Sequence, residues 1–459
     1  MSQSNSQVVT TSTSSEKATE RLQNQVFKGD PSRSRFNACV GDNGNPDIYY
    51  YADGFSQATF ALIGSVVDNY SENPIDTFIY PICFNLRHSV ELYLKALWDE
   101  LCALANIKRK PIQQFRIKNK EVNVLKVHDI SVIWRGIKTN AINFDVRFKS
   151  IINNLEPLIL CIHEVDPTGQ TFRYSYDMET KDKHLVPVSL INILNLKESF
   201  DLINKYIHEL RVLSGYLIYE YSMNTFTNKL NREDISNISS MLPPRSMWQD
   251  CDFDTIKREV MARYGIGARE LSLAVNFILR VHDFSASIQL EHKPLGLSED
   301  DILKFVDIWS IKNDLNEWRE QLQKRLADDE NHGIEYYQFT SRELVRKVLA
   351  NLDGNKESFD KLLEYATPRN ISGLMALLEY RGCLFSEEYV IKYNNHLSYL
   401  KRKFEQGGGE WRAVVENVWD ESLNSKYCLE KIIKVLRNLN MPSSAQTLEG
   451  YCMVEGLIP

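Results

Sequence analysis

One segment, residues 80–95, combines the pattern of a buried helix with several ionisable side chains, and it constrains the fold more than any other part of the chain. Most of its side chains are apolar around the whole helix, which predicts that the helix is buried. It also carries Arg87, His88, Glu91 and Lys95. Because charged groups in apolar surroundings must be paired or must line a cleft, the segment predicts either a buried ion network or a functional site.

The ion-network alternative requires no substrate. Arg87 and Glu91 lie one helical turn apart, as do Glu91 and Lys95, and opposite charges at this spacing meet on one face of a helix. Buried ion networks can fix how helices pack without taking part in a reaction. In this interpretation the charged residues only set the packing of a helical bundle.

Length and composition describe an ordinary globular chain with more than one domain. The 459 residues are too many for one compact core. The net charge of −7 argues against a protein that coats nucleic acid over its whole surface. The eight cysteines lie far apart, and neither a signal peptide nor a bilayer-spanning apolar run stands out. We therefore expect a cytoplasmic protein with reduced thiols and no membrane partner.

Apolar residues recur at helical spacing over most of the chain, and no strong strand pattern competes with them. We predict helices over about 50–69, over the Arg87 segment with Pro81 in its first turn, over 145–164 and over 192–222. These predict a four-helix bundle at 36–230 after a disordered tail at 1–25. Residues 231–330 and 334–459 are expected to form one or two further helical domains, so the predicted fold class is all-α.

A basic insert interrupts the helical pattern between about 107 and 127. Apolar residues alternate on both sides of Asn119, which predicts a short hairpin. The insert carries seven lysines and arginines, including Lys118 and Lys120, against Glu121 as its one acid. We expect these cations to contact nucleic-acid phosphates, or alternatively to form a solvated surface hairpin.

Four short motifs follow one another through residues 45–225. They are Tyr51-Ala52-Asp53-Gly54, then Arg87-His88-Ser89-Val90-Glu91-Leu92-Tyr93-Leu94-Lys95, then His128-Asp129, then Asp166-Pro167 with Phe172-Arg173-Tyr174. In this order they resemble a widespread group of bacterial proteins whose helical domain is similar to the HEPN class. The resemblance implies an antiviral defence or toxin-type protein that acts on RNA, commonly as a homodimer and with partner proteins of a defence operon.

Metal-independent cleavage of RNA needs a group that moves protons and a cation that stabilises the charged phosphate, which histidine and arginine supply. The resemblance therefore implies His88 as the general acid or base and Arg87 as the phosphate clamp. Arg173 would be a second clamp, and His128 an alternative proton shuttle. Neither a metal nor an organic cofactor is expected.

The other polar residues of these motifs would support that chemistry. Glu91 or Asp177 would orient the reacting imidazole, and Lys95, Lys118 and Lys120 would bind the substrate.

Two of the motifs also have simpler interpretations. His128-Asp129 fits the start of a helix, with Asp129 as its cap. Arg173 and Asp177 fit an ordered turn that is held by a local ion pair.

The motifs depart from the nuclease pattern of the HEPN class, in which one to two helical turns separate an arginine from a histidine. Arg87 and His88 are adjacent, and the only match to that spacing in the chain, Arg325 and His332, lies outside the resembling region with three acids between the two. The sequence thus leaves two functions open. One is a metal-independent endoribonuclease, and the other is a non-catalytic helical interaction or nucleotide-binding protein of a defence system.

Overall fold

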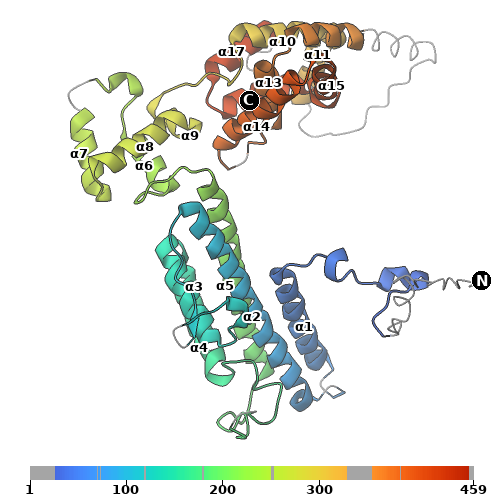
Figure 1. Ribbon diagram of the computed structural model, residues 1–459, viewed down its shortest axis with the longest axis vertical. Coiled ribbons are helices and arrows are strands. Elements are labelled where there is room, and N and C mark those ends of the chain that lie inside the picture. Colours follow the sequence, from blue (N-terminus) through green and yellow to red (C-terminus); the bar gives the residue numbers. More distant parts are fainter. Residues whose placement is uncertain are drawn as a thin grey trace, which may run out of the picture. The chain divides into compact units, whose positions relative to one another are not determined.

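Helices form nearly all of the regular structure in the computed structural model (Figure 1), which confirms the predicted all-α class. The structure describes residues 26–327 and 354–453, except Tyr70, Asn73, 118–119, 178–179, 250–252 and Cys383. The predicted tail at 1–25 lies outside these residues. The chain divides into two compact units: the first holds residues up to 102 and 112–212, and the second holds 103–111 and the residues from 213 onward.

Five α-helices contribute to the first unit, one more than the sequence predicts. They are α1 (Ile48–Asp68), α2 (Ile75–Lys108), α3 (Ile130–Phe144), α4 (Phe148–Val165) and α5 (Ile193–Ser222), with 3-10 turns at Pro31–Phe36, Gly41–Asn43 and Val124–Lys126. The additional helix is α3. It forms because Asp129 caps its first turn and because one face of it, with Ile133, Trp134 and Ile137, is buried.

The long helix α2 begins earlier than predicted. Its first residue is Ile75, so the prediction that Pro81 lies in the first turn is wrong. Proline lacks the N–H that would bond to the carbonyl of Thr77, and the apolar burial of α2 holds the helix together across this missing bond. Ile82, Leu86 and other side chains along α2 are almost completely buried.

Side chains on α1 connect that helix to α2 and α5. Tyr93 of α2 donates a hydrogen bond to Asp53 of α1 at 2.7 Å. Ser56 of α1 donates to Asn204 of α5 at 3.0 Å. The rings of Phe60 and Phe200 also stack between α1 and α5, with their centroids 5.0 Å apart.

The basic insert contains the predicted hairpin. Strands β1 (Arg116–Ile117) and β2 (Lys120–Glu121) pair antiparallel, with Arg116 opposite Glu121. The hairpin is anchored by Phe115, whose ring lies 4.3 Å from that of Trp98 on α2. A Cβ at Gly136 of α3 would lie 2.5 Å from the Phe115 ring, so only glycine fits there.

The second unit is also helical. Its helices are α6 (Arg232–Met241), α7 (Phe253–Tyr264), α8 (Ala268–Arg280), α9 (His282–Ser285), α10 (Glu299–Lys312), α11 (Leu315–Ala327), α13 (Pro368–Glu379), α14 (Glu387–Glu405), α15 (Gly408–Val418), α16 (Cys428–Asn438) and α17 (Pro442–Cys452), with short turns at Arg245–Met247, Ala286–Ile288 and Trp419–Leu423. Two apolar clusters form its core, one within 230–288 and one within 297–452. Within the described part of the chain, no helix has the length and apolarity that a bilayer span requires.

Candidate functional site

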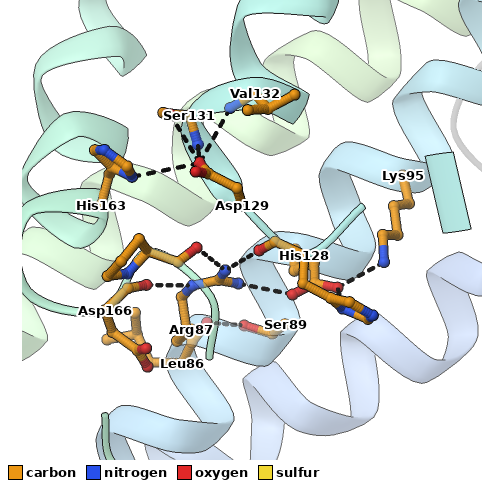
Figure 2. Close-up of polar contacts among 12 residues, drawn as sticks. Leu86, Arg87, Ser89, Lys95, His128, Asp129, Ser131, Val132, His163 and Asp166 are labelled. Carbon is orange, nitrogen blue, oxygen red and sulfur yellow. Dashed lines mark hydrogen bonds and ion pairs between the residues drawn. The ribbon is translucent and has the colours of Figure 1, made fainter. Parts of the chain in front are cut away.

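Arg87 joins three segments that lie far apart in the sequence (Figure 2). Its Nε donates a hydrogen bond to the carbonyl of Asp166 at 2.9 Å, and its Nη2 donates to the carbonyls of His128 and Pro167 at 2.7 and 2.9 Å. Its Nη1 donates to the Glu91 carboxylate at 3.0 Å. The guanidinium is 2% exposed and its donors are nearly all used, so it fastens α2 to the segments before α3 and after α4.

Glu91 lies at the centre of these contacts. Its Oε1 accepts from Nζ of Lys95 at 2.6 Å and lies 3.1 Å from Nδ1 of His128. Burial raises the pKa of this carboxyl, but the hydrogen bond from Lys95 and the charge of Arg87 outweigh burial, and the pKa of Glu91 falls below its ordinary value. Glu91 is therefore a buried anion between two cations, and both predicted pairs on α2 are confirmed.

We call Arg87, Glu91, Lys95 and His128 the Arg87 cluster, and His128 is its member in contact with solvent. The side chain of His128 is 62% exposed, whereas those of Glu91 and Lys95 are 6% and 4% exposed. A neutral imidazole that donates its Nδ1–H to a carboxylate carries its lone pair on Nε2. The backbone of His128 is therefore fixed by Arg87, while its ring is largely exposed and has a free lone pair on Nε2.

The predicted helix cap at Asp129 is confirmed (Figure 2). Oδ1 of Asp129 accepts hydrogen bonds from the backbone N–H groups of Ser131 and Val132 at 2.9 and 3.3 Å. Nδ1 of His163 on α4 lies 3.5 Å from the same carboxylate. This cap begins α3 immediately after His128 and so helps to fix the position of that residue.

His88 lies on α2 beside the Arg87 cluster but takes a different environment. Its ring meets Phe55 of α1 edge-on at 4.5 Å and stacks on Phe84 at 5.7 Å. Burial lowers the pKa of His88; the charge of Glu91 opposes this shift, and the charge of Arg87 adds to it. We therefore expect His88 to be neutral at pH 7, as a general base would be and a general acid would not.

Arg173 lies in the segment between α4 and α5. Its guanidinium lies 5.5 Å from the ring centre of Phe84 and 5.3 Å from that of Tyr174. It lines a cavity of about 450 Å³ together with Tyr80, Tyr174, Lys183 and His184. The cavity thus presents basic side chains beside aromatic rings.

Lys183 and His184 were not singled out from the sequence. The signal was the segment 181–184, in which Lys181, Lys183 and His184 surround Asp182, but its position depends on folding. An isolated bridge pairs Tyr176 with Lys183, and the backbone N–H of His184 donates to the carbonyl of Ser175 at 3.0 Å. These contacts place Lys183 and His184 beside Arg173 in the cavity.

The residues that were predicted to bind substrate, as far as the structure describes them, do not lie together in one site. Lys95 is 3% exposed in its ion pair with Glu91, and Lys120 is exposed on β2. Lys118 lies outside the described residues. Asp177 accepts a hydrogen bond from the backbone N–H of Thr180 at 2.8 Å, within a turn.

Of the other arginine–histidine pair, Arg325 and His332, the structure describes only the arginine. Arg325 forms an ion pair with Glu430 at 2.8 Å, and His332 lies outside the described residues. Among the residues that the structure describes, no group of three or more His, Cys, Asp or Glu side chains could hold a metal ion.

Comparisons with models of protein families, with curated proteins and with solved structures found no match to this chain. The similarity of the first unit to the HEPN class therefore stays a prediction from its sequence motifs.

Proposed function

We propose that the first unit binds RNA and cleaves it without a metal, with His128 as the group that transfers the proton. The observation that supports this is the contact of 3.1 Å between the buried Glu91 carboxylate and the exposed His128 imidazole. A buried carboxylate is costly, and this one is kept ionised by two cations while it also holds an imidazole. A carboxylate in that position orients the ring and fixes which ring nitrogen carries the proton, as general base catalysis requires.

In the proposed reaction, Nε2 of His128 takes the proton from a ribose 2′-hydroxyl. The 2′ oxygen bonds to the adjacent phosphorus while the bond from phosphorus to the 5′ oxygen breaks. The leaving oxygen takes up the proton of the imidazolium, directly or through a water that relays it, and the imidazole is regenerated. The products are a 2′,3′-cyclic phosphate and a 5′-hydroxyl end, and Glu91 stabilises the imidazolium between the two proton transfers.

The cavity beside Arg173 would hold the RNA. Arg173 and Lys183 offer cations to phosphate groups, His184 offers a ring nitrogen for a hydrogen bond, and Tyr80 and Tyr174 offer rings on which bases stack. The exposed fractions of the two tyrosines, 48% and 43%, leave their rings available to a ligand.

Arg87 has a positioning role in this proposal, and not the clamping role implied by the family resemblance. Its guanidinium is occupied by three backbone carbonyls and by Glu91, so a phosphate would have to displace protein hydrogen bonds. Arg87 acts on the reaction through the backbone carbonyl of His128 and through the carboxylate that His128 contacts.

The burial of Arg87, Glu91 and Lys95 favours a second candidate function. If the Arg87 cluster serves only to hold the helices together, the first unit is a non-catalytic interaction or nucleotide-binding module. The basic and aromatic cavity would then bind a nucleotide without cleaving it. A toxin or defence role, a homodimer and operon partners derive from the sequence resemblance alone and stay predictions.

Growth of cells that express the wild type, His128→Ala or His208→Ala tests the proposal, with total RNA examined in parallel. His208 is exposed on α5 outside the Arg87 cluster and is a matched control. We expect slow growth and RNA fragments with 2′,3′-cyclic phosphate ends for the wild type and His208→Ala, but not for folded His128→Ala. Fragments in His128→Ala would contradict the proposed role of His128, and intact RNA in the wild type would favour the non-catalytic module.

A further inference from the structure

A second cavity in the first unit is apolar and lies between α2, α4, α5 and the segments that join them. Its volume is about 260 Å³. Its lining includes Leu86 of α2, Leu158 and Ile162 of α4, and Phe200 and Ile203 of α5. A cavity of about 150 Å³ with a similar lining of Leu, Ile and Phe is large enough to bind benzene. This cavity can therefore take a molecule of one or two rings.

One polar group in the lining stands out. Asp166 is 1% exposed, and its Oδ1 accepts a hydrogen bond from the backbone N–H of Thr171 at 3.1 Å. Within the described part of the chain, its Oδ2 is buried and has no hydrogen-bond partner. A buried acceptor without a donor costs roughly 1–3 kcal/mol, so a group that satisfied it would gain that interaction.

Arg87 does not satisfy this oxygen, although both residues line the cavity. The guanidinium bonds to the backbone carbonyl of Asp166, and the carboxylate turns away from it (Figure 2). Water is a poor occupant of the apolar interior because it needs two to four polar partners, and the lining is dominated by carbon.

We infer that this cavity binds a small apolar ring compound with one N–H or O–H group, which donates its hydrogen bond to Oδ2 of Asp166. Apolar walls with one well-placed polar group are typical of small-molecule sites. The rings would pack against Leu86, Ile162 and Phe200, and the single donor would set their orientation. The inference does not depend on RNA cleavage, since neither His128 nor Arg173 lines this cavity, although it shares Phe172 and Val188 with the cavity beside Arg173.

Isothermal titration of the full-length protein with indole and with indene provides the test. The two probes have nearly the same shape, but only indole carries an N–H donor. We expect indole to bind roughly tenfold more tightly than indene, as one hydrogen bond to a buried acceptor implies. In Asp166→Asn, whose amide N–H₂ can take the place of Oδ2, the preference for indole should disappear.

Ser199→Trp and Glu198→Trp locate the site. Both residues are exposed on α5, but only Ser199 lines the cavity. The new side chain in Ser199→Trp should block indole binding, and Glu198→Trp should leave it unchanged, with thermal melts to confirm that both variants fold. Failure of the wild type to bind indole, equal affinity for indole and indene, or unchanged binding in Ser199→Trp would each overturn the inference.

Discussion

Each of the two units contains a buried arginine with carboxylate partners, and the two arginines are arranged differently. In the second unit Arg232 of α6 forms ion pairs with Asp283 of α9 and Glu387 of α14, and Thr225 donates a hydrogen bond to Glu387. Its guanidinium also lies 4.5 Å from the ring centre of Phe385. We call Arg232, Asp283, Glu387 and Thr225 the Arg232 cluster.

The difference between the clusters lies in what they hold. The Arg232 cluster joins helices through two carboxylates, and its members include no histidine. The Arg87 cluster fixes three backbone carbonyls and places Glu91 against the exposed imidazole of His128. A buried arginine alone therefore indicates packing, whereas a buried anion against an exposed imidazole supports the proposed site.

Removal of either guanidinium has the largest expected effect on the free energy of unfolding. It tests whether both clusters stabilise the packing of their helices. Arg87→Ala and Arg232→Ala each leave buried acceptors without a donor, which costs about 3–5 kcal/mol of unfolding free energy. Urea unfolding of both variants measures this loss, with Lys120→Ala on the exposed hairpin as a control that should change little. A loss for Arg87→Ala no larger than that for Lys120→Ala would show that the Arg87 cluster does not hold the helices together.

Part of this cluster was readable from the sequence because it is local. The pairs of Glu91 with Arg87 and with Lys95 follow from helical spacing, and the cap at Asp129 follows from residue type. The bonds from Arg87 to the carbonyls of His128, Asp166 and Pro167 do not, because they join segments separated by 41 to 80 residues.

The cap at Asp129 predicted where α3 begins, but the length of α3 and the start of α2 were missed for a related reason. Gly136 lowers the intrinsic helix propensity of α3, and burial of its apolar side chains, including Ile133 and Ile137, compensates for it. Proline is common in the first turn of a helix. Pro81 instead lies inside α2, and the helix continues through it because the surrounding side chains pack. The apolar cavity at Asp166 could not be predicted either, because its lining comes from three helices and their connections.

Glu91→Gln sharpens the comparison by removing charge without changing shape. It leaves Arg87 and Lys95 buried without a counterion, and we expect a loss of about 2 kcal/mol at pH 7. The pKa of Glu91 lies below the ordinary 4.5, so its ionised form stabilises the fold above that pH, and this contribution is lost as the pH falls through the lowered pKa. Thermal melts from pH 7 to acid should show the difference from wild type shrinking, and a constant difference would contradict this account.

Titration of His88 gives the smallest expected effect on stability. It tests whether the environment of His88 differs from that of His128, the other imidazole beside Glu91. Burial lowers the pKa of His88 from 6.5, so the neutral ring stabilises the fold above that pH, and the contribution is lost as the pH falls through the lowered pKa. NMR of the labelled imidazoles should show His88 titrating below 6.5, with His88→Gln to assign the signal. A pKa at or above 6.5 would contradict the buried environment that the structure gives His88.

The most direct test of the assignment is cleavage of a labelled single-stranded RNA by purified wild type and His128→Ala, with a chelator present and His208→Ala as the control. A general base contributes about 10²–10⁴-fold to a rate, so His128→Ala should lose activity by that factor at unchanged stability, while His208→Ala keeps it. Equal rates for wild type and His128→Ala would show that the imidazole on Glu91 takes no part in the reaction.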